Sequence, residues 1–127
     1  MLPCAMPRVL LCDDFEGTRA LIRAILEEHA DIQVVGEAGE AQGCIEQAAL
    51  LGPDVIVLDI DMPGMSGLEA IPLLLEQAAS SAILVCSGRP AAECEQQALD
   101  LGAAAYLEKR VTIDEISRVV RQAAAAV

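Results

Sequence analysis

Short apolar runs alternate with longer segments of helical periodicity along the whole chain. The runs with strand character are Arg8 to Cys12, Ile32 to Glu37, Val55 to Leu58, Ile83 to Cys86 and Ala104 to Leu107. Strands that are apolar on both faces must be buried on both, and strand–helix alternation requires right-handed crossovers into a parallel sheet. The pattern therefore predicts an α/β fold, a doubly wound five-stranded parallel sheet in the order 2-1-3-4-5 with five helices.

Apolar residues at helical spacing locate three of the helices between the strands. They lie within Leu21 to Leu26, Ile45 to Leu50 and Leu68 to Leu75. Pro72 falls inside the third helix, where a proline is tolerated only in the first turns.

Sequence signals at their ends locate the last two helices. The fourth is expected from about Ala91 to Leu101, because Gly102 ends it. The fifth is expected to begin at Thr112, since Thr112 and Glu115 match the T-x-x-E capping box and Val111 and Ile116 are spaced as a hydrophobic staple.

A chain of 127 residues has room for one domain. We expect a single domain over 1–127, folded from about residue 8 to 122, with tails at 1–7 and 123–127. The longest apolar runs, such as Ala70 to Leu75, fall far short of the ~20 residues that a membrane span needs. The first residues lack the basic start and long apolar stretch of a secretory signal, so we expect a cytoplasmic protein with no membrane contact.

The cysteines give no sign of a disulfide framework or a zinc site. They are odd in number, show no paired spacing and lie mostly in apolar runs, at Cys4, Cys12, Cys44, Cys86 and Cys94. We therefore expect all of them to be small core residues of an intracellular protein. His29 is the single histidine, so a zinc cluster has no plausible set of ligands.

The charge balance argues against direct binding of nucleic acid. Eight basic residues against twenty acidic ones leave a net charge of −12, which repels a phosphate backbone. Lys109 is the only lysine in the chain.

Polar residues follow four of the five predicted strands. They are Asp13 and Asp14 after the first strand, Asp59 after the third, Ser87 after the fourth and Lys109 after the fifth. The carboxyl ends of parallel strands form the ligand crevice of such a sheet, so these side chains should converge. Each residue alone has an ordinary explanation, as a turn former, a helix cap or a solvated lysine. Their joint placement favours a site.

The residue types in this crevice suit phosphoryl transfer to a carboxylate. Three neighbouring carboxylates repel one another unless a cation offsets them, and Mg²⁺ prefers such oxygen ligands. A carboxylate can then act as nucleophile toward a phosphoryl group. Lys109 would supply positive charge, and Ser87 a hydroxyl, for the phosphoryl oxygens.

Four segments carry a resemblance to a known family. They are Val9 to Asp14, Pro53 to Glu69 (PDVIVLDIDMPGMSGLE), Ser87-Gly88 and Gly102 to Lys109. Over nearly the whole chain the sequence resembles the receiver domain of two-component response regulators, which has a flavodoxin-like fold. The stretches Val34 to Ala38 and Met62 to Glu69 are most similar to receivers attached to helix-turn-helix DNA-binding domains.

The resemblance implies a role for each site residue. Asp59 would accept phosphate from a histidine kinase or phosphotransfer protein, and Asp13, Asp14, Asp59 and the carbonyl of Asp61 would hold Mg²⁺. Lys109 and Ser87 would contact the phosphoryl group.

The resemblance also implies a switch and an output. Tyr106 would turn inward when Ser87 moves toward the phosphate. The surface of the fourth helix, fifth strand and fifth helix would then control an output domain, a downstream protein or a second copy of the chain. A receiver is not a turnover enzyme.

Three positions depart from the family pattern. Arg110 follows Lys109 where the family usually has a proline joined by a cis peptide, and we expect a trans bond because a non-proline cis bond costs ~2.5–4 kcal/mol. Ala105 replaces a common glycine before Tyr106. Asp61 is an acid where neutral residues are also common, and we expect it to pair with Arg89 and tune the phosphoryl lifetime.

Three other interpretations compete. A flavin-binding protein of the same fold would want a phosphate-cradling loop after the first strand and aromatic residues, which make up 2% of the chain. A phosphatase-type hydrolase would use Asp59 and Asp61 as nucleophile and acid, and would leave Asp13 and Asp14 unexplained. A receiver-like interaction module would keep the fold without accepting phosphate.

Overall fold

The computed structural model of the chain describes residues 6–125, without the side chains of residues 111 and 112. It contains a five-stranded parallel sheet in the order β2-β1-β3-β4-β5. The strands are β1 (Arg8–Cys12), β2 (Gln33–Ala38), β3 (Val55–Leu58), β4 (Ala82–Ser87) and β5 (Ala105–Glu108). The predicted fold class and strand order are confirmed.

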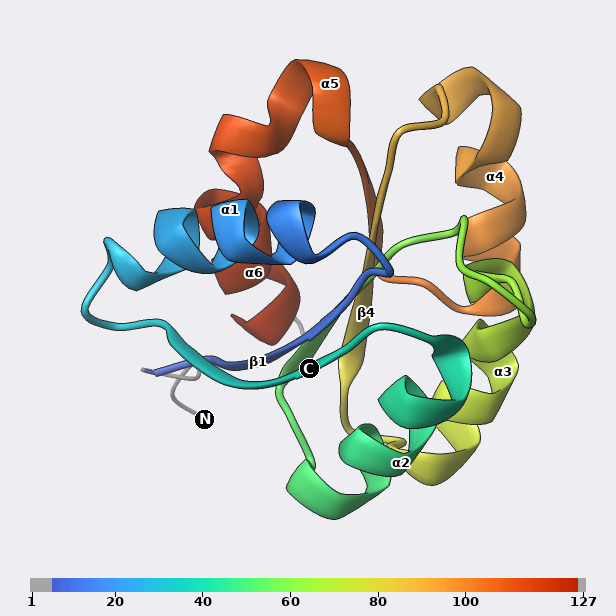
Figure 1. The fold of residues 1–127 in the computed structure, drawn as a ribbon, viewed down its shortest axis with the longest axis horizontal. Helices are drawn as coiled ribbons and strands as arrows, with labels where there is room; N and C mark the ends of the chain where they lie inside the picture. Colours follow the sequence, from blue (N-terminus) through green and yellow to red (C-terminus); the bar gives the residue numbers. More distant parts are fainter. Residues whose placement is uncertain (1–5, 126–127) are drawn as a thin grey trace.

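Helices cover both faces of the sheet, as Figure 1 shows with the sheet seen between two helical layers. One layer consists of α1 (Glu16–Glu27) and α6 (Ile116–Ala125), and the other of α2 (Ala41–Leu51), α3 (Gly67–Gln77) and α4 (Ala91–Leu101). A one-turn helix, α5 (Lys109–Thr112), and a 3-10 turn, Ile113–Glu115, connect β5 to α6.

Successive side chains of the central strands point to opposite faces of the sheet, and both faces are covered by helices. In β1, Val9 and Leu11 pack in the core under α1 and α6, whereas Leu10 and Cys12 pack in the core under α2, α3 and α4. Every residue of β3 is buried in the same alternating way. The carboxyl ends of β1 and β3 pair directly, with Cys12 opposite Leu58, and this pairing fixes where the following residues lie.

The start of α3 and the end of α4 have the structures that their local sequences favour. Ser66 caps α3, because its hydroxyl accepts a hydrogen bond from the Leu68 N–H at 3.0 Å and the Glu69 carboxylate accepts one from the Ser66 N–H at 3.3 Å. Pro72 lies within α3, and the helix continues past it to Gln77. The fourth helix has the predicted bounds and ends at Gly102, whose φ of 117° favours glycine.

The predicted start of the fifth helix at Thr112 is wrong. Helical structure begins at Lys109, directly after β5, and passes through the 3-10 turn before α6. A proline after the lysine would push that lysine toward extended backbone, whereas Arg110 allows it to be helical. No cis peptide bond occurs in the described part of the chain, as predicted for Lys109-Arg110. The predicted capping box and staple involve the side chains of residues 111 and 112, which lie outside the description.

The predicted limits of the folded region are too narrow at both ends. Helix α6 continues to Ala125, and Ala123 and Ala124 are buried against the sheet. Pro7 is also buried, and its carbonyl accepts a hydrogen bond from the Gln33 N–H at 2.9 Å. The rest of the predicted tails, 1–5 and 126–127, lies outside the described residues.

The prediction that every cysteine is an unpaired core residue is wrong for two of them. Cys12, at the end of β1, and Cys44, in α2, form a disulfide with their Cα atoms 5.9 Å apart. Their separation of 32 residues carries no signal in the sequence, and it is the packing of α2 on β1 that brings them together. Both are buried, which shields the bond from attacking thiolates. Cys86 and Cys94 are free and buried, as predicted, and Cys4 lies outside the described residues.

Among the described residues, no helix has the length and apolar character needed to cross a membrane.

Candidate functional site

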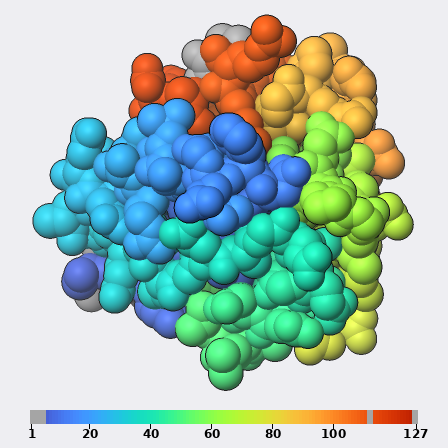
Figure 2. All heavy atoms as spheres, viewed as in Figure 1, coloured from blue at the N-terminus to red at the C-terminus, as the bar shows by residue number. Residues whose placement is uncertain are grey.

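Two carboxylates are buried where the central strands end. Asp13 follows β1 and Asp59 follows β3, and their exposed fractions are only 3% and 5%. The Asp59 N–H donates to the Cys12 carbonyl at 2.9 Å, which ties the two strand ends together. In the space-filling view the blue segment after β1 lies against the light-green segment after β3 (Figure 2).

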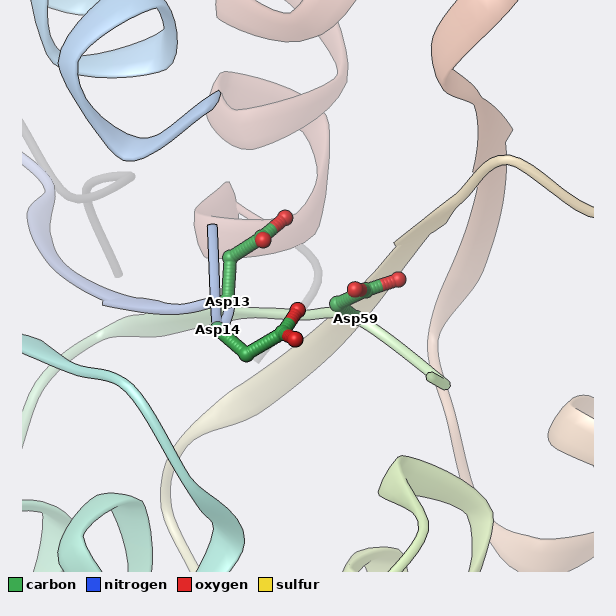
Figure 3. A group of neighbouring side chains, drawn as sticks. All are labelled: Asp13, Asp14 and Asp59. Atoms are coloured by element: carbon green, nitrogen blue, oxygen red, sulfur yellow. The ribbon is translucent and has the colours of Figure 1, made fainter. Parts of the chain in front are cut away.

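Asp14 joins this pair and is itself exposed. Figure 3 shows the side chains of Asp13, Asp14 and Asp59 side by side at the ends of the two strands. One carboxylate oxygen from each residue lies within 4.8 Å of the other two. The structure therefore brings together the three acids that the sequence singled out.

Lys109 is the cation that faces these acids. Its Nζ donates a hydrogen bond to Oδ2 of Asp13 and lies 3.4 Å from Oδ1 of Asp59. Burial tends to lower the pKa of Lys109, but the hydrogen bond to Asp13 and the charge of Asp59 outweigh it and leave that pKa raised. The ammonium therefore stays charged.

Asp59 is poorly satisfied by its surroundings. Burial raises the pKa of its carboxyl to about 6, and the nearby charge of Asp13 adds to this, although Lys109 opposes both. Oδ1 of Asp59 is fully buried and accepts no hydrogen bond. A buried carboxylate oxygen that accepts no hydrogen bond and has only the ion pair with Lys109, next to two further carboxylates, belongs to a donor set that fits a hard divalent cation such as Mg²⁺.

Ser87 and Tyr106 lie near the site on β4 and β5. Ser87 is completely buried, and its hydroxyl accepts a hydrogen bond from the Arg89 N–H at 3.1 Å. Gly88 lies between Ser87 and Arg89 in the sequence, and the space beside it is open, since a Cβ there would meet nothing within 4 Å. The Tyr106 hydroxyl donates to the Arg89 carbonyl at 2.8 Å, and burial raises its pKa. One loop, after β4, thus contacts both residues predicted to form the switch.

Asp61 and Arg89 form the pair that the sequence predicts. The guanidinium donates from Nε to Oδ2 at 3.0 Å and from Nη2 to Oδ1 at 2.7 Å, so the contact is bidentate. This hydrogen bond holds the pKa of Asp61 below its usual value. Both side chains are about half exposed, and Arg89 also contacts Glu93 at 3.2 Å.

Gly67, at the start of α3, contacts the site and was not among the residues predicted to form it. A Cβ at this position would lie 2.0 Å from the carbonyl oxygen of Asp59. The Gly67 N–H donates to the Ile60 carbonyl at 2.8 Å, so α3 begins in direct contact with the backbone of Asp59. The signal was available in the segment MPGMSGLE, where a second glycine precedes the helix without a turn to explain it.

Comparisons with known proteins identify the family of the chain. The chain matches the family model of the response regulator receiver domain over residues 9–121. It is therefore a member of the response regulator receiver domain family, a regulatory module of two-component systems.

Two relatives match most of the chain. It is 39% identical over 117 residues to the nitrate/nitrite response regulator protein NarL of Escherichia coli K12, covering 92% of this chain and 54% of that protein. It is 38% identical over 107 residues to a protein-glutamate methylesterase/protein-glutamine glutaminase of Maricaulis maris, covering 83% of this chain and 27% of that enzyme. The chain thus spans about half or less of these relatives.

Among solved structures, the signal receiver domain of a putative response regulator NarL from Mycobacterium tuberculosis is similar throughout. The TM-score is 0.87 at 31% identity, and the match covers 94% of this chain and 96% of that one.

Proposed function

We propose that the chain is a phosphoacceptor whose Asp59 is phosphorylated, with Mg²⁺, by a histidine kinase or phosphotransfer protein. The observation that carries this proposal is the buried Asp59 carboxylate, whose Oδ1 has no hydrogen bond and lies 3.4 Å from the ammonium of Lys109. A buried carboxylate without a full set of hydrogen bonds lowers the stability of the fold. Its position among Asp13, Asp14 and Lys109 suits phosphoryl transfer, which explains why such a carboxylate is present.

In the proposed reaction an oxygen of Asp59 attacks the phosphorus atom of the donor. The new P–O bond forms as the bond from phosphorus to the donor breaks, a P–N bond in a phosphohistidine. The leaving imidazole nitrogen keeps the electron pair and takes a proton from solvent. Lys109 offsets the charge on the phosphoryl oxygens, and Ser87 supplies a hydroxyl once released from the Arg89 N–H.

Three of the proposed metal ligands come from carboxylates that the structure already brings together, and the fourth would be a backbone carbonyl. The carboxylates of Asp13, Asp14 and Asp59 and the backbone carbonyl of Asp61 would hold Mg²⁺. The ion would neutralise the acid cluster and the incoming phosphoryl oxygens.

Phosphorylation is proposed to act at a distance through Ser87 and Tyr106. Both contact the backbone of Arg89, so a movement of this loop toward the phosphate would break the Tyr106 hydrogen bond to the Arg89 carbonyl. Two arrangements of the surface of α4, β5 and α6 would then differ in affinity for the phosphoryl group. Beryllofluoride with Mg²⁺ should shift backbone resonances across that surface, and shifts confined to the neighbours of Asp59 would show an uncoupled domain.

The proposed partners follow from this role. They are a histidine kinase or phosphotransfer protein, an output domain or downstream protein, and a second copy of the chain. We also propose a cytoplasmic location, no direct contact with nucleic acid, and no turnover activity.

Mass spectrometry after incubation with acetyl phosphate and Mg²⁺ tests the proposal. Wild type should gain one phosphate and Asp59→Asn none. Equal labelling of the two proteins would move the phosphate elsewhere. A wild type that takes no phosphate would leave the receiver-like interaction module as the better description.

A further inference from the structure

The corner between β1 and α1 is held by four contacts that all end on Asp13. Its N–H donates to the Ala38 carbonyl at 3.1 Å, and its Oδ1 accepts from the Phe15 N–H at 2.9 Å. Oδ2 accepts from Lys109. The fourth contact is made by Arg19 of α1, whose Nη1 donates to the Asp13 carbonyl oxygen at 2.5 Å.

Arg19 occupies a place in its helix where a cation is unfavourable. Its N–H donates to the carbonyl of Phe15, the N-cap residue of α1, so it lies within reach of the positive end of the helix dipole. Its side chain is only 18% exposed. The acceptors that offset these costs are the Asp13 carbonyl and Oε1 of Glu37, which Nε contacts at 3.0 Å.

Glu37 also pairs with a second arginine of α1, through its other carboxylate oxygen. Arg23 donates from Nε to Oε2 of Glu37 at 2.7 Å. Although burial tends to raise the pKa of Glu37, the hydrogen bonds from Arg23 and Arg19 leave it lowered. Glu37 is therefore a charged anchor that holds the Arg19 guanidinium against the end of β1.

We propose that Arg19 is a positioning residue for the magnesium site. The carbonyl that it holds belongs to the peptide between Asp13 and Asp14, so the hydrogen bond fixes the plane of that peptide. The orientation of this plane sets the directions in which the two carboxylates leave the backbone. This inference rests on the proposed function, since it assigns Arg19 to the same site.

The direction in which Mg²⁺ affinity changes when Arg19 is replaced separates a positioning role from a simple effect of its charge. A cation near the acid cluster repels Mg²⁺, so its removal should tighten Mg²⁺ binding if charge were all that mattered. Loss of positioning should weaken it instead, as loss of groups that orient metal ligands does. Arg23 is a matched control, because it lies on the same helix, contacts the same Glu37 and makes no hydrogen bond to Asp13 among those the structure records.

Calorimetric titration of the unphosphorylated chain with MgCl₂ tests the proposal directly. We expect Arg19→Ala to weaken Mg²⁺ affinity about tenfold. Arg19→Lys should weaken it less, by about threefold, because an ammonium keeps the charge but cannot reach both acceptors in a fixed fork. Arg23→Ala should stay within about twofold of wild type, because it leaves in place both contacts of Arg19, to Oε1 of Glu37 and to the Asp13 carbonyl. Affinity in Arg19→Ala equal to or tighter than wild type would overturn the proposal.

The rate of labelling by acetyl phosphate at a series of Mg²⁺ concentrations adds a second measurement. Arg19→Ala should need more Mg²⁺ for half-maximal rate and keep the wild-type rate at saturation. A lower saturating rate with an unchanged midpoint would contradict a positioning role. Should Arg19→Ala fail to fold, Arg19→Lys and Arg19→Gln carry the test, and unchanged Mg²⁺ affinity in both would overturn it.

Failure of this inference can be told from failure of the proposed function. Wild type that binds Mg²⁺ and accepts phosphate, with Arg19 variants unchanged, refutes only the role of Arg19. A wild type that neither binds Mg²⁺ nor accepts phosphate refutes the role of Arg19 and the proposed function together.

Discussion

Two ion-paired clusters lie close together at the carboxyl edge of the sheet and differ in burial and in charge balance. In the inner cluster, Asp13 and Asp59 are almost completely buried and share one cation, Lys109. In the outer cluster, Asp61 and Arg89 are about half exposed and form a bidentate pair, and Glu93 also contacts Arg89. With Asp14, the inner cluster has three carboxylates for one cation, whereas the outer cluster has two for one and is screened by solvent.

Two aspartates only two positions apart in the sequence, Asp59 and Asp61, therefore have pKa values shifted in opposite directions. Burial raises the pKa of Asp59 to about 6, whereas the hydrogen bond from Arg89 lowers that of Asp61. In the proposed function, the buried Asp59 with too few partners receives the phosphoryl group and helps to hold the cation. For the exposed Asp61–Arg89 pair we expect no more than an influence on access to Asp59.

The largest expected difference between the clusters is in phosphorylation rate. Lys109→Ala should slow labelling by acetyl phosphate about 100-fold or more, because it removes the buried charge that faces the phosphoryl oxygens. Arg89→Ala should change the rate by less than about threefold, because solvent screens an exposed cation. The measurement is the initial rate of phosphate incorporation at saturating Mg²⁺, with circular dichroism as the folding control. Comparable rates for the two variants would remove the distinction between the clusters.

The second difference is in stability, measured by urea unfolding with a chelator present. Asp59→Asn should raise the free energy of unfolding by roughly 2 to 3 kcal/mol at pH 7.5, since it removes a carboxylate whose pKa is about 6 in the folded protein against an ordinary value of 3.8. Asp61→Asn should not stabilise the protein.

The pH dependence of this gain has a definite sign. Between about pH 4 and pH 6 the unfolded chain has lost the Asp59 proton while the folded protein keeps it, so wild-type stability falls as pH rises through this window. The advantage of Asp59→Asn should therefore grow over these pH values and level off above them. For Asp61, whose pKa is lowered, the stabilising contribution is present above its usual pKa and is lost as pH falls. An advantage of Asp59→Asn that is independent of pH would mean that Asp59 is not strained by burial.

Most of the inner cluster could be predicted from the sequence because it depends on the ends of strands. Runs of apolar residues fix the strands, and parallel pairing then places Asp13 beside Asp59 without further information. The bidentate Asp61–Arg89 contact followed from the same reasoning, since each residue lies two positions beyond a residue of the site.

Features that depend on tertiary packing escaped prediction. The Cys12–Cys44 disulfide joins a strand to a helix that packs on it, and no spacing rule describes such a pair. The close approach of Gly67 to the Asp59 carbonyl is a contact between a loop and a helix start. The helical start at Lys109 was missed because the capping signal at Thr112 is local, whereas the chain turns into a helix as soon as β5 ends.

The smallest expected effect concerns the outer pair and the lifetime of the phosphoryl group. The bidentate contact joins the loops that follow β3 and β4, and we expect it to narrow the approach of water to Asp59. Asp61→Asn and Arg89→Ala should each speed dephosphorylation by about two- to fivefold, because an exposed and screened pair can change a barrier only slightly.

Mg²⁺ affinity provides the control for this last prediction. It should stay within about twofold of wild type in Arg89→Ala, since the guanidinium bonds the Asp61 carboxylate and not the carbonyl proposed to face the ion. Loss of radioactive phosphate from the labelled protein measures the rate, and high salt should reduce the difference between wild type and variants because it screens the pair. If both variants lose phosphate at the wild-type rate, the outer pair does not control access. The inner cluster would then set the phosphoryl lifetime alone.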